Sequence, residues 1–179
     1  DKVEIYLVDK GDKILSKSKS FNRESAIAAI SKRNIKIYLK HHIKSINETS
    51  LELLTDDNQI NSSLRINYSG LVWTAGLKLS PLKVVDHFLD KKNKIKVNKF
   101  LQINEYQNIF FVGDITFSED DPFPSSAQVA MQQGFLTAQN IISLRTRNKL
   151  KIFEFEDHGE MLSLGIGNAS ITGYGITLA

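Results

Sequence analysis

The chain has 179 residues, of which 41% are hydrophobic and 24% charged, and its formal net charge is +3. These values are typical of a globular protein, and so small and dispersed a charge argues against nucleic acid as a partner. No cysteine is present, which excludes disulfides and thiolate metal sites, and no apolar run is long enough to predict a transmembrane helix.

The first predicted strand starts at Val3 and ends in an acid, Asp9. In a dinucleotide-binding βαβ unit, the second strand ends in a carboxylate that binds the adenosine ribose hydroxyls, and Asp9 fits that position. The Gly-rich turn that accompanies such an acid would lie before residue 1, so we expect the chain to be a piece of a longer protein. A simple turn residue is the alternative role for Asp9.

A short helix is expected next, with Asn22 as its N-cap and an apolar face that includes Ala26 and Ala29. Four short apolar runs follow, and strong turn residues separate the later ones. They predict a strand and then a β-meander, in the segments 35–39, 43–46, 51–54 and 64–66.

The stretch Gly70–Gly76 is apolar almost throughout, which predicts a central parallel strand. Its small final residues, Ala75 and Gly76, would form a floor beneath a nicotinamide ring. The alternative is a tight turn after a strand with Trp73 in the core. The next segment, 83–103, predicts a helical turn near Val84 and short strands at 95–97 and 101–103, without chemistry.

Four apolar residues, Ile109–Val112, predict a strand covered on both faces. Gly113 then lets the backbone approach a ligand closely, and Asp114 stands at the carboxyl end of the strand, where open α/β sheets bind ligands. A carboxylate there would accept hydrogen bonds from sugar or ribityl hydroxyls. A turn-capping aspartate is the alternative.

Ser125 and Gln128 form a capping box that predicts the start of a long helix. The free amides of its first turn and its dipole favour partial negative charge, such as that on the pyrimidine carbonyls of a reduced flavin. An ordinary core helix is the alternative, but it leaves Gln128, Gln132 and Gln133 unexplained. The helix carries one apolar stripe at helical spacing, composed of Ala127, Ala130, Met131, Gly134, Phe135, Ala138, Ile141 and Ile142.

Beyond the helix, Phe153–Glu156 alternates as a strand, and glycines 165, 167, 173 and 175 predict the turns of a β-rich segment. The four histidines show no metal-ligand spacing, so we predict no metal site and no catalytic side chain.

Gly113-Asp114 followed by Ala127-Gln128-x-Ala130-x-Gln132-Gln133-Gly134 resembles the second flavin-binding segment of type II NADH dehydrogenases. These enzymes belong to the pyridine nucleotide-disulfide oxidoreductase superfamily. Trp73-Thr74-Ala75-Gly76 is similar to their link between the nicotinamide and flavin domains. Residues 159–165 resemble their C-terminal domain, especially that of photosynthetic-type quinone reductases.

The resemblance implies an α/β fold. It would be a partial two-dinucleotide-binding-domain flavoprotein, Rossmann-like with a β-meander, followed by the start of a C-terminal β-rich domain. Residues 1–76 would be the C-terminal part of the NAD(P)H-binding domain. Residues 77–148 would be the second segment of the FAD-binding domain, and residues 149–179 would begin the C-terminal domain.

The resemblance also implies FAD and NAD(P)H as cofactors and a membrane quinone as electron acceptor. Asp114, after Gly113, would hold the ribityl chain, and the amides around Ala127 and Gln128 would stabilise the reduced flavin. Gln128 and Gln132 would face the quinone. The nicotinamide nucleotide would be bound by Asp9, Ala75 and Gly76.

The implied location is the cytoplasmic side of a thylakoid or plasma membrane, with peripheral attachment through segments beyond this chain. A homodimer is left open, and the fragment alone is expected to be inactive. Two other readings keep the fold. One is an enzyme with a soluble acceptor, like ferredoxin- or rubredoxin-type reductases, and the other is a non-catalytic nucleotide-binding remnant.

Overall fold

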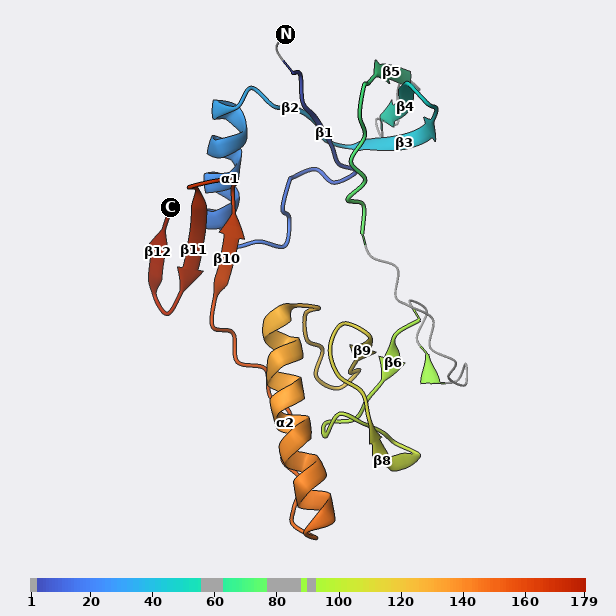
Figure 1. Ribbon diagram of the computed structural model, residues 1–179, viewed down its shortest axis with the longest axis vertical. Helices are drawn as coiled ribbons and strands as arrows, with labels where there is room; N and C mark the ends of the chain where they lie inside the picture. Colours follow the sequence, from blue (N-terminus) through green and yellow to red (C-terminus); the bar gives the residue numbers. More distant parts are fainter. Residues whose placement is uncertain (1–2, 56–62, 77–87, 90–92) are drawn as a thin grey trace. The chain divides into compact units, whose positions relative to one another are not determined.

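The computed structural model describes residues 3–55, 63–76, 88–89 and 93–179 (Figure 1). The chain forms two compact units. Unit 1 consists of Asp1–Thr74 together with His158–Ala179, and unit 2 is Ala75–Asp157. Among the helices of the described ranges, none has the length and apolar character needed to cross a bilayer.

Unit 1 begins with a βαβ arrangement. Strand β1 (Tyr6–Val8) pairs in parallel with β2 (Lys36–Tyr38), and helix α1 (Ser20–Lys32) connects them. Parallel strands need such a crossover because a tight hairpin can join only antiparallel ones. The predicted first strand and first helix are therefore confirmed, and the acid Asp9 directly follows β1.

The predicted meander is present as three antiparallel strands, β3 (His41–Ile46), β4 (Ser50–Thr55) and β5 (Ser63–Asn67). Its core consists of the buried side chains of Leu51, Leu53 and Ile66. Tyr6, Val8 and Tyr38 of the parallel pair pack against this cluster, which joins the meander to the βαβ arrangement.

The C-terminal strands of unit 1 form an antiparallel sheet that packs against α1 (Figure 1). They are β10 (Glu160–Ser163), β11 (Ala169–Gly173) and β12 (Ile176–Leu178). The expected β-rich character is thus found in residues 160–178. The strand expected at 153–156 is absent, because this segment has no paired neighbour in the described structure.

Asn22 does not cap α1. Lys19 is the N-cap residue, and Asn22 lies inside the helix with its side chain fully buried. Its Nδ2 donates to Glu160 Oε2 at 2.9 Å, and its Oδ1 accepts a hydrogen bond from the Thr172 hydroxyl at 2.8 Å and another from Ser170. The prediction was wrong because these partners lie about 140 residues away in sequence.

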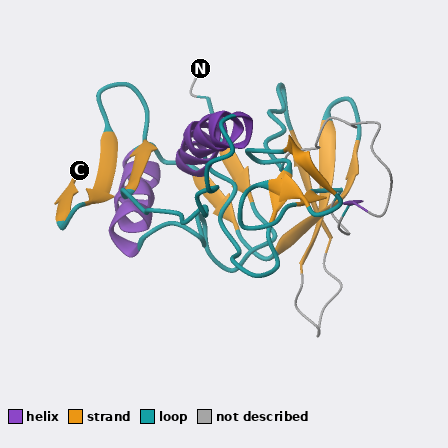
Figure 2. Cartoon of the chain, turned by 90° about the horizontal axis from the view of Figure 1, so that it is seen from below, coloured by secondary structure: helices purple, strands orange, loops and turns teal. Residues whose placement is uncertain are grey.

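In the part of unit 2 that the structure describes, there are two short strand pairs and a long helix (Figure 2). The pair β6 (Ile95–Lys96) and β9 (Thr116–Phe117) is parallel, and β7 (Gln102–Ile103) with β8 (Tyr106–Phe110) is antiparallel. Helix α2 (Ala127–Arg145) follows. The hydrophobic core of this unit is formed by Phe88, Ile95, Val97, Leu101, Ile103, Val129 and Phe153.

Two predicted strands differ from the structure. Strand β8 ends at Phe110, pairs in an antiparallel manner and leaves Ile109 and Val112 exposed. Residues 70–76 form no strand, and the Val72 side chain is 86% exposed. Apolar runs become buried strands only where other strands pair with them and cover them, and within the described ranges no strand pairs with 70–76. The helical turn expected near Val84 lies outside the described residues.

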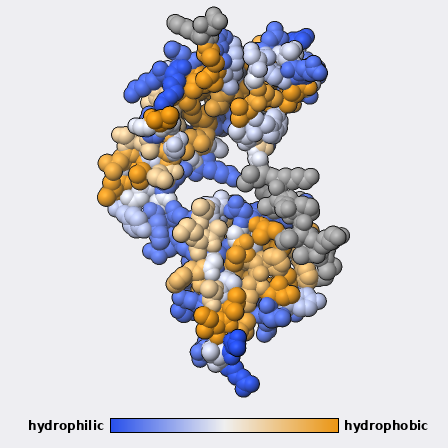
Figure 3. All heavy atoms as spheres, in the orientation of Figure 1, coloured by the Kyte–Doolittle hydropathy of each residue, from blue (hydrophilic) through white to orange (hydrophobic). Residues whose placement is uncertain are grey.

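The predicted apolar stripe of α2 does not face the core. Met131 and Phe135 are 75% and 71% exposed, and apolar side chains reach the surface of the molecule at several places (Figure 3). The face of α2 that packs inward is largely polar instead. It carries Val129, Gln133, Thr137 and Asn140 at helical spacing. Periodicity identified the helix correctly, but the apolar stripe is not the face that packs inward.

Candidate functional site

The N-terminus of α2 is the first part of the candidate site. Ser126, not Ser125, is the N-cap, and its hydroxyl accepts a hydrogen bond from the Val129 N–H at 3.3 Å. Ser125 instead accepts a hydrogen bond from the Lys94 ammonium at 2.6 Å. Ala127 begins the helix in an exposed position. A helix of 19 residues concentrates partial positive charge at this end, which suits an anionic or electron-rich ligand.

The Gly113 turn is the second part. Gly113 has a φ of +80°, a conformation that favours glycine. Its N–H donates to Gln133 Oε1 at 2.6 Å, and its carbonyl accepts from the Thr116 N–H at 3.0 Å and the Thr116 hydroxyl at 2.8 Å. The next residue, Asp114, is exposed, so the turn holds a carboxylate at the surface.

The structure brings this turn onto α2. A Cβ placed at Gly113 would lie 3.7 Å from the Cβ of Ala130, so the small side chain at 130 allows close packing between turn and helix. One helical turn after Ala130, Gln133 accepts the hydrogen bond from the Gly113 N–H. The sequence placed Gln133 in a motif but gave it no role. Its burial followed from a contact with a residue 20 positions away, which no local pattern reveals.

Gln132 is engaged with the main chain. Its Nε2 donates to the Glu156 carbonyl at 2.8 Å, and its Oε1 accepts from the Glu156 N–H at 3.0 Å. These two bonds fasten the segment after α2 back onto the helix. Gln128, one turn earlier, is half-buried. The two residues predicted to face a quinone therefore have different surroundings.

Asp9 lies in unit 1, whereas all other predicted site residues lie in unit 2. Its Oδ1 accepts a hydrogen bond from the Gly11 N–H at 2.7 Å, and its own N–H donates to the Tyr38 carbonyl at 2.9 Å. The carboxylate is thus fixed at the carboxyl end of the parallel pair. In unit 2, Ala75 is exposed, and Gly76 has a φ of +89° with no atom of the described residues within 4 Å of the place where a Cβ would lie.

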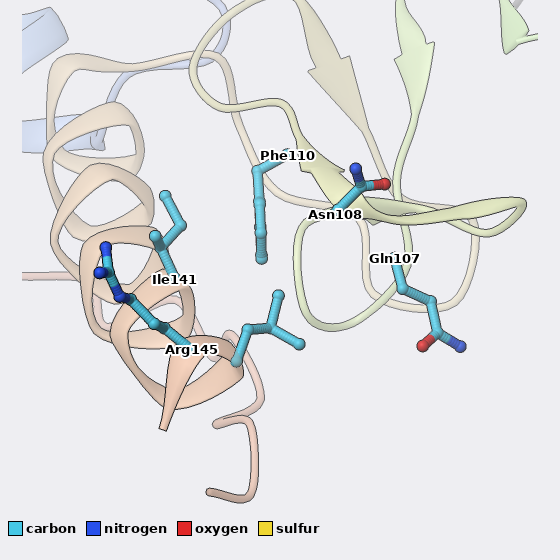
Figure 4. Close-up of a pocket in the computed structure, with 6 residues that line it drawn as sticks. Gln107, Asn108, Phe110, Ile141 and Arg145 are labelled. Carbon is cyan, nitrogen blue, oxygen red and sulfur yellow. The ribbon is translucent and has the colours of Figure 1, made fainter. Parts of the chain in front are cut away.

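A groove lies at the other end of α2 (Figure 4). Phe110, Ile141 and Leu144 form its apolar wall, and Arg145 lies at its edge, with Gln107 and Asn108 on the strand side. Its volume is about 480 Å³. The groove begins about 20 Å along the helix from Ala127, at 1.5 Å per residue, and contains none of the predicted site residues. It is therefore separate from the candidate cofactor site.

The side chains in the ranges that the structure describes form no candidate metal site. No group of three histidine, aspartate or glutamate side chains is close enough there to hold an ion.

A parallel βαβ arrangement ending in an acid, together with a Gly-Asp turn packed on a helix, defines an α/β protein of the dinucleotide-binding class. The family model described as pyridine nucleotide-disulphide oxidoreductase matches residues 2–134. The chain therefore belongs to this family.

Individual proteins similar to this chain are consistent with the family assignment. The chain is 30% identical over 169 residues to a type II NADH:quinone oxidoreductase of Staphylococcus aureus, covering 92% of this chain and 41% of that protein. Among solved structures, it is similar to NDH2 from Plasmodium falciparum in complex with NADH, with a TM-score of 0.84 and 13% identity, covering 98% of this chain and 51% of the other. The sulfide:quinone oxidoreductase of Aquifex aeolicus has a TM-score of 0.76 and 15% identity, with 95% and 42% covered.

These matches confirm the predicted fold class and the resemblance to type II NADH dehydrogenases. The chain spans about two-fifths of the length of the curated relatives that it matches.

Proposed function

We propose that this chain forms part of an FAD-dependent oxidoreductase that takes a hydride from NAD(P)H and passes electrons to a membrane quinone. Family membership supports the class of reaction, and the similarity to a type II NADH:quinone oxidoreductase supports the acceptor. The structural observation that carries the proposal is the Gly113 turn. Hydrogen bonds to Gln133 and Thr116 hold its backbone, and the next residue, Asp114, is exposed.

The residues present fit a flavin. The Asp114 carboxylate would accept hydrogen bonds from the ribityl hydroxyls, and the N-terminus of α2 at Ala127 and Gln128 would stabilise the added electron density. Bound FAD would supply the hydride-accepting and electron-releasing chemistry. The protein would position the group and exclude water, and no side-chain acid or base is required.

The nicotinamide nucleotide would be bound by Asp9, with Ala75 and Gly76 beneath its ring. The fixed position of the Asp9 carboxylate at the end of β1 supports this assignment. Gln128 and Gln132 would face the quinone, and Gln132 would have to release its two bonds to Glu156 in order to bind it.

The proposed domains are 1–76 for NAD(P)H, 77–148 for FAD and 149–179 for the start of a C-terminal domain. The boundary between the compact units after Thr74 supports the first division. The proposed location is the cytoplasmic side of a thylakoid or plasma membrane, with peripheral attachment through segments outside these residues.

Flavin binding is the first test. The protein, purified in its native form, is titrated with FAD while flavin fluorescence is recorded, and Asp114→Ala is compared with Asp121→Ala, another exposed loop aspartate. We expect Asp114→Ala to weaken FAD binding by about 10- to 100-fold, the worth of a hydrogen bond to a charged group. Asp121→Ala should bind normally. Absence of FAD from the native protein, with no uptake, would end the proposal.

Electron acceptors form the second test. NADH oxidation is followed with a soluble quinone analogue and, in parallel, with ferredoxin and rubredoxin. Faster reduction of quinone supports the proposal, whereas faster reduction of a soluble protein acceptor supports the other enzyme reading. FAD binding without turnover on any acceptor would support a non-catalytic remnant.

A further inference from the structure

Gln133 is an unusual buried side chain. It lies in the middle of α2 and is 0% exposed, although buried amides are normally fully hydrogen-bonded. Its Oε1 accepts the Gly113 N–H at 2.6 Å. Its Nε2 is buried and has no hydrogen-bond partner among the described residues. Half of the amide is therefore satisfied and half is not.

The orientation of this amide follows from its partner. A backbone N–H can only donate, so the oxygen of Gln133 must face Gly113, and a flipped amide would place two donors against each other. The unpaired Nε2 destabilises the fold. A methionine of similar length would avoid that cost. What glutamine adds at this position is thus the acceptor oxygen.

That oxygen completes the fixation of Gly113. Strand β8 ends at Phe110, so the N–H of Gly113 is beyond the strand ladder. Gln133 binds this N–H, and Thr116, which is itself buried, binds the carbonyl. Both polar groups of Gly113 are therefore held, one residue before the exposed carboxylate of Asp114.

We infer that Gln133 is a positioning residue, whose side-chain oxygen sets the Gly113 turn and thereby the place of the Asp114 carboxylate. The contact with Gly113 is independent of any ligand. Its purpose, to hold Asp114 for a flavin, rests on the proposed function.

The unmodified chain gives the first test. In the native protein labelled with ¹⁵N and ¹³C, we expect a scalar coupling through the hydrogen bond between the Gly113 amide nitrogen and the Gln133 side-chain carbonyl carbon. We also expect the Gly113 amide to exchange slowly with solvent. Rapid exchange of this amide without the coupling would overturn the inference, whatever the behaviour of any variant.

Variants distinguish the effect of the Gln133 side-chain oxygen from the effect of packing at this position. Gln133→Met removes the acceptor while keeping the length, and Gln133→Glu restores an acceptor oxygen. Thr137→Val is the matched control, because Thr137 is buried one turn further along α2 and its hydroxyl also lacks a partner in the described structure. We expect the Gly113 amide to exchange at least about tenfold faster in Gln133→Met. It should exchange at nearly the original rate in Gln133→Glu and in Thr137→Val.

If amide exchange in Gln133→Met becomes faster by the same factor at Gly113 and in strands β6 and β9, the role of Gln133 is purely structural and the inference is overturned. If Gln133→Met does not fold, restored protection in Gln133→Glu still supports it, and lost protection there overturns it.

FAD titration then tests the purpose of the contact. In the native protein we expect Gln133→Met to weaken FAD binding by about tenfold, with recovery in Gln133→Glu. Equal FAD affinity in Gln133→Met and the unmodified protein would overturn the positioning role. If the unmodified protein binds no FAD, the proposed function fails, while the result at the Gly113 amide stands by itself.

Discussion

Helices α1 and α2 each bury a polar side chain, but the hydrogen-bonding groups of these two side chains are satisfied to different degrees. In α1, Asn22 uses both ends of its amide, donating to Glu160 and accepting from Ser170 and Thr172. In α2, Gln133 uses only its oxygen, and Thr137 beside it also has a buried hydroxyl without a partner in the described ranges. A buried polar group without a partner calls for an explanation, and at Gln133 we find it in the hydrogen bond that holds the Gly113 turn.

The helices also differ at their N-termini. At α1, a carboxylate from another element reaches the helix end, since Glu160 accepts the Lys19 N–H at 2.9 Å. At α2, the N-cap Ser126 directly precedes the helix, and its own hydroxyl accepts the Val129 N–H at 3.3 Å. The positive end of α1 is thus held by a carboxylate of the protein itself, whereas under the proposed function that of α2 would face the flavin.

The largest effect is expected from Asn22→Ala. The change leaves the buried Ser170 hydroxyl without its acceptor and removes the amide donor to Glu160, so unit 1 should lose about 3 kcal/mol of unfolding free energy. Hydrogen exchange of α1 and β11, measured by mass spectrometry, reports this loss. Glu24→Ala, an exposed change in the same helix, is the control. Comparable losses in the two variants would refute the special role of Asn22.

The next effect concerns the segment that follows α2. Asn140 is buried and binds Lys151 twice, donating to its carbonyl at 2.9 Å and accepting from its N–H at 2.8 Å. Asn140→Ala should therefore destabilise unit 2 by about 2 kcal/mol and speed exchange of the Lys151 amide. Asn148→Ala is the control, because Asn148 is exposed and its side chain donates to the hydroxyl of Thr146, two residues earlier. Protection of the Lys151 amide that survives Asn140→Ala would contradict this account.

Local patterns in the sequence were enough to predict several elements. The βαβ arrangement, the meander, the long helix and the C-terminal strands depend on periodicity and on turn residues such as Asn47 and Gly175, which act within a few positions. The resemblance carried by the Gly-Asp and glutamine motifs led to the correct family.

Other features depended on distant partners and could not be predicted. Which face of α2 is buried depends on Gly113 and Lys151, because their main-chain groups bind Gln133 and Asn140. The burial of Asn22 depends on strands at the other end of the chain. For Gly70–Gly76, the apolar pattern was read correctly, but a strand also needs a paired neighbour. Of the candidate site, the motif positions were predicted, and the hydrogen bond that fixes Gly113 was not.

A smaller effect is expected at the N-terminus of α1. Burial raises the pKa of Glu160, but hydrogen bonds from Ser18, the Lys19 N–H and Asn22 outweigh it, so the pKa lies below the usual value. A carboxyl whose pKa is lower in the folded than in the unfolded state stabilises the fold at pH values above its unfolded-state pKa. This contribution is lost as the pH falls through the folded-state pKa. Glu160→Gln should cost about 0.5 kcal/mol at pH 7.

The cost of Glu160→Gln should begin to shrink as the pH falls below about 4.5, where the carboxyl of the unfolded chain becomes protonated, and should disappear once the folded-state carboxyl is protonated as well. Urea unfolding of the two proteins between neutral and acidic pH measures this convergence, with the exposed Glu48→Gln as control. A difference that stays constant with pH would mean that the charge of Glu160 does not contribute.

The smallest effect should be found on the exposed face of α2. Phe135 is 71% exposed, so Phe135→Ser should change the unfolding free energy of unit 2 by no more than about 0.5 kcal/mol. Val129, which is 2% exposed on the opposite face, provides the contrast, because Val129→Ser should cost about 3 kcal/mol through lost packing and a buried hydroxyl. Urea unfolding of both variants measures the difference. If Phe135→Ser costs as much as Val129→Ser, the apolar stripe is a core surface in solution, and the buried polar face with Gln133 no longer distinguishes α2 from α1.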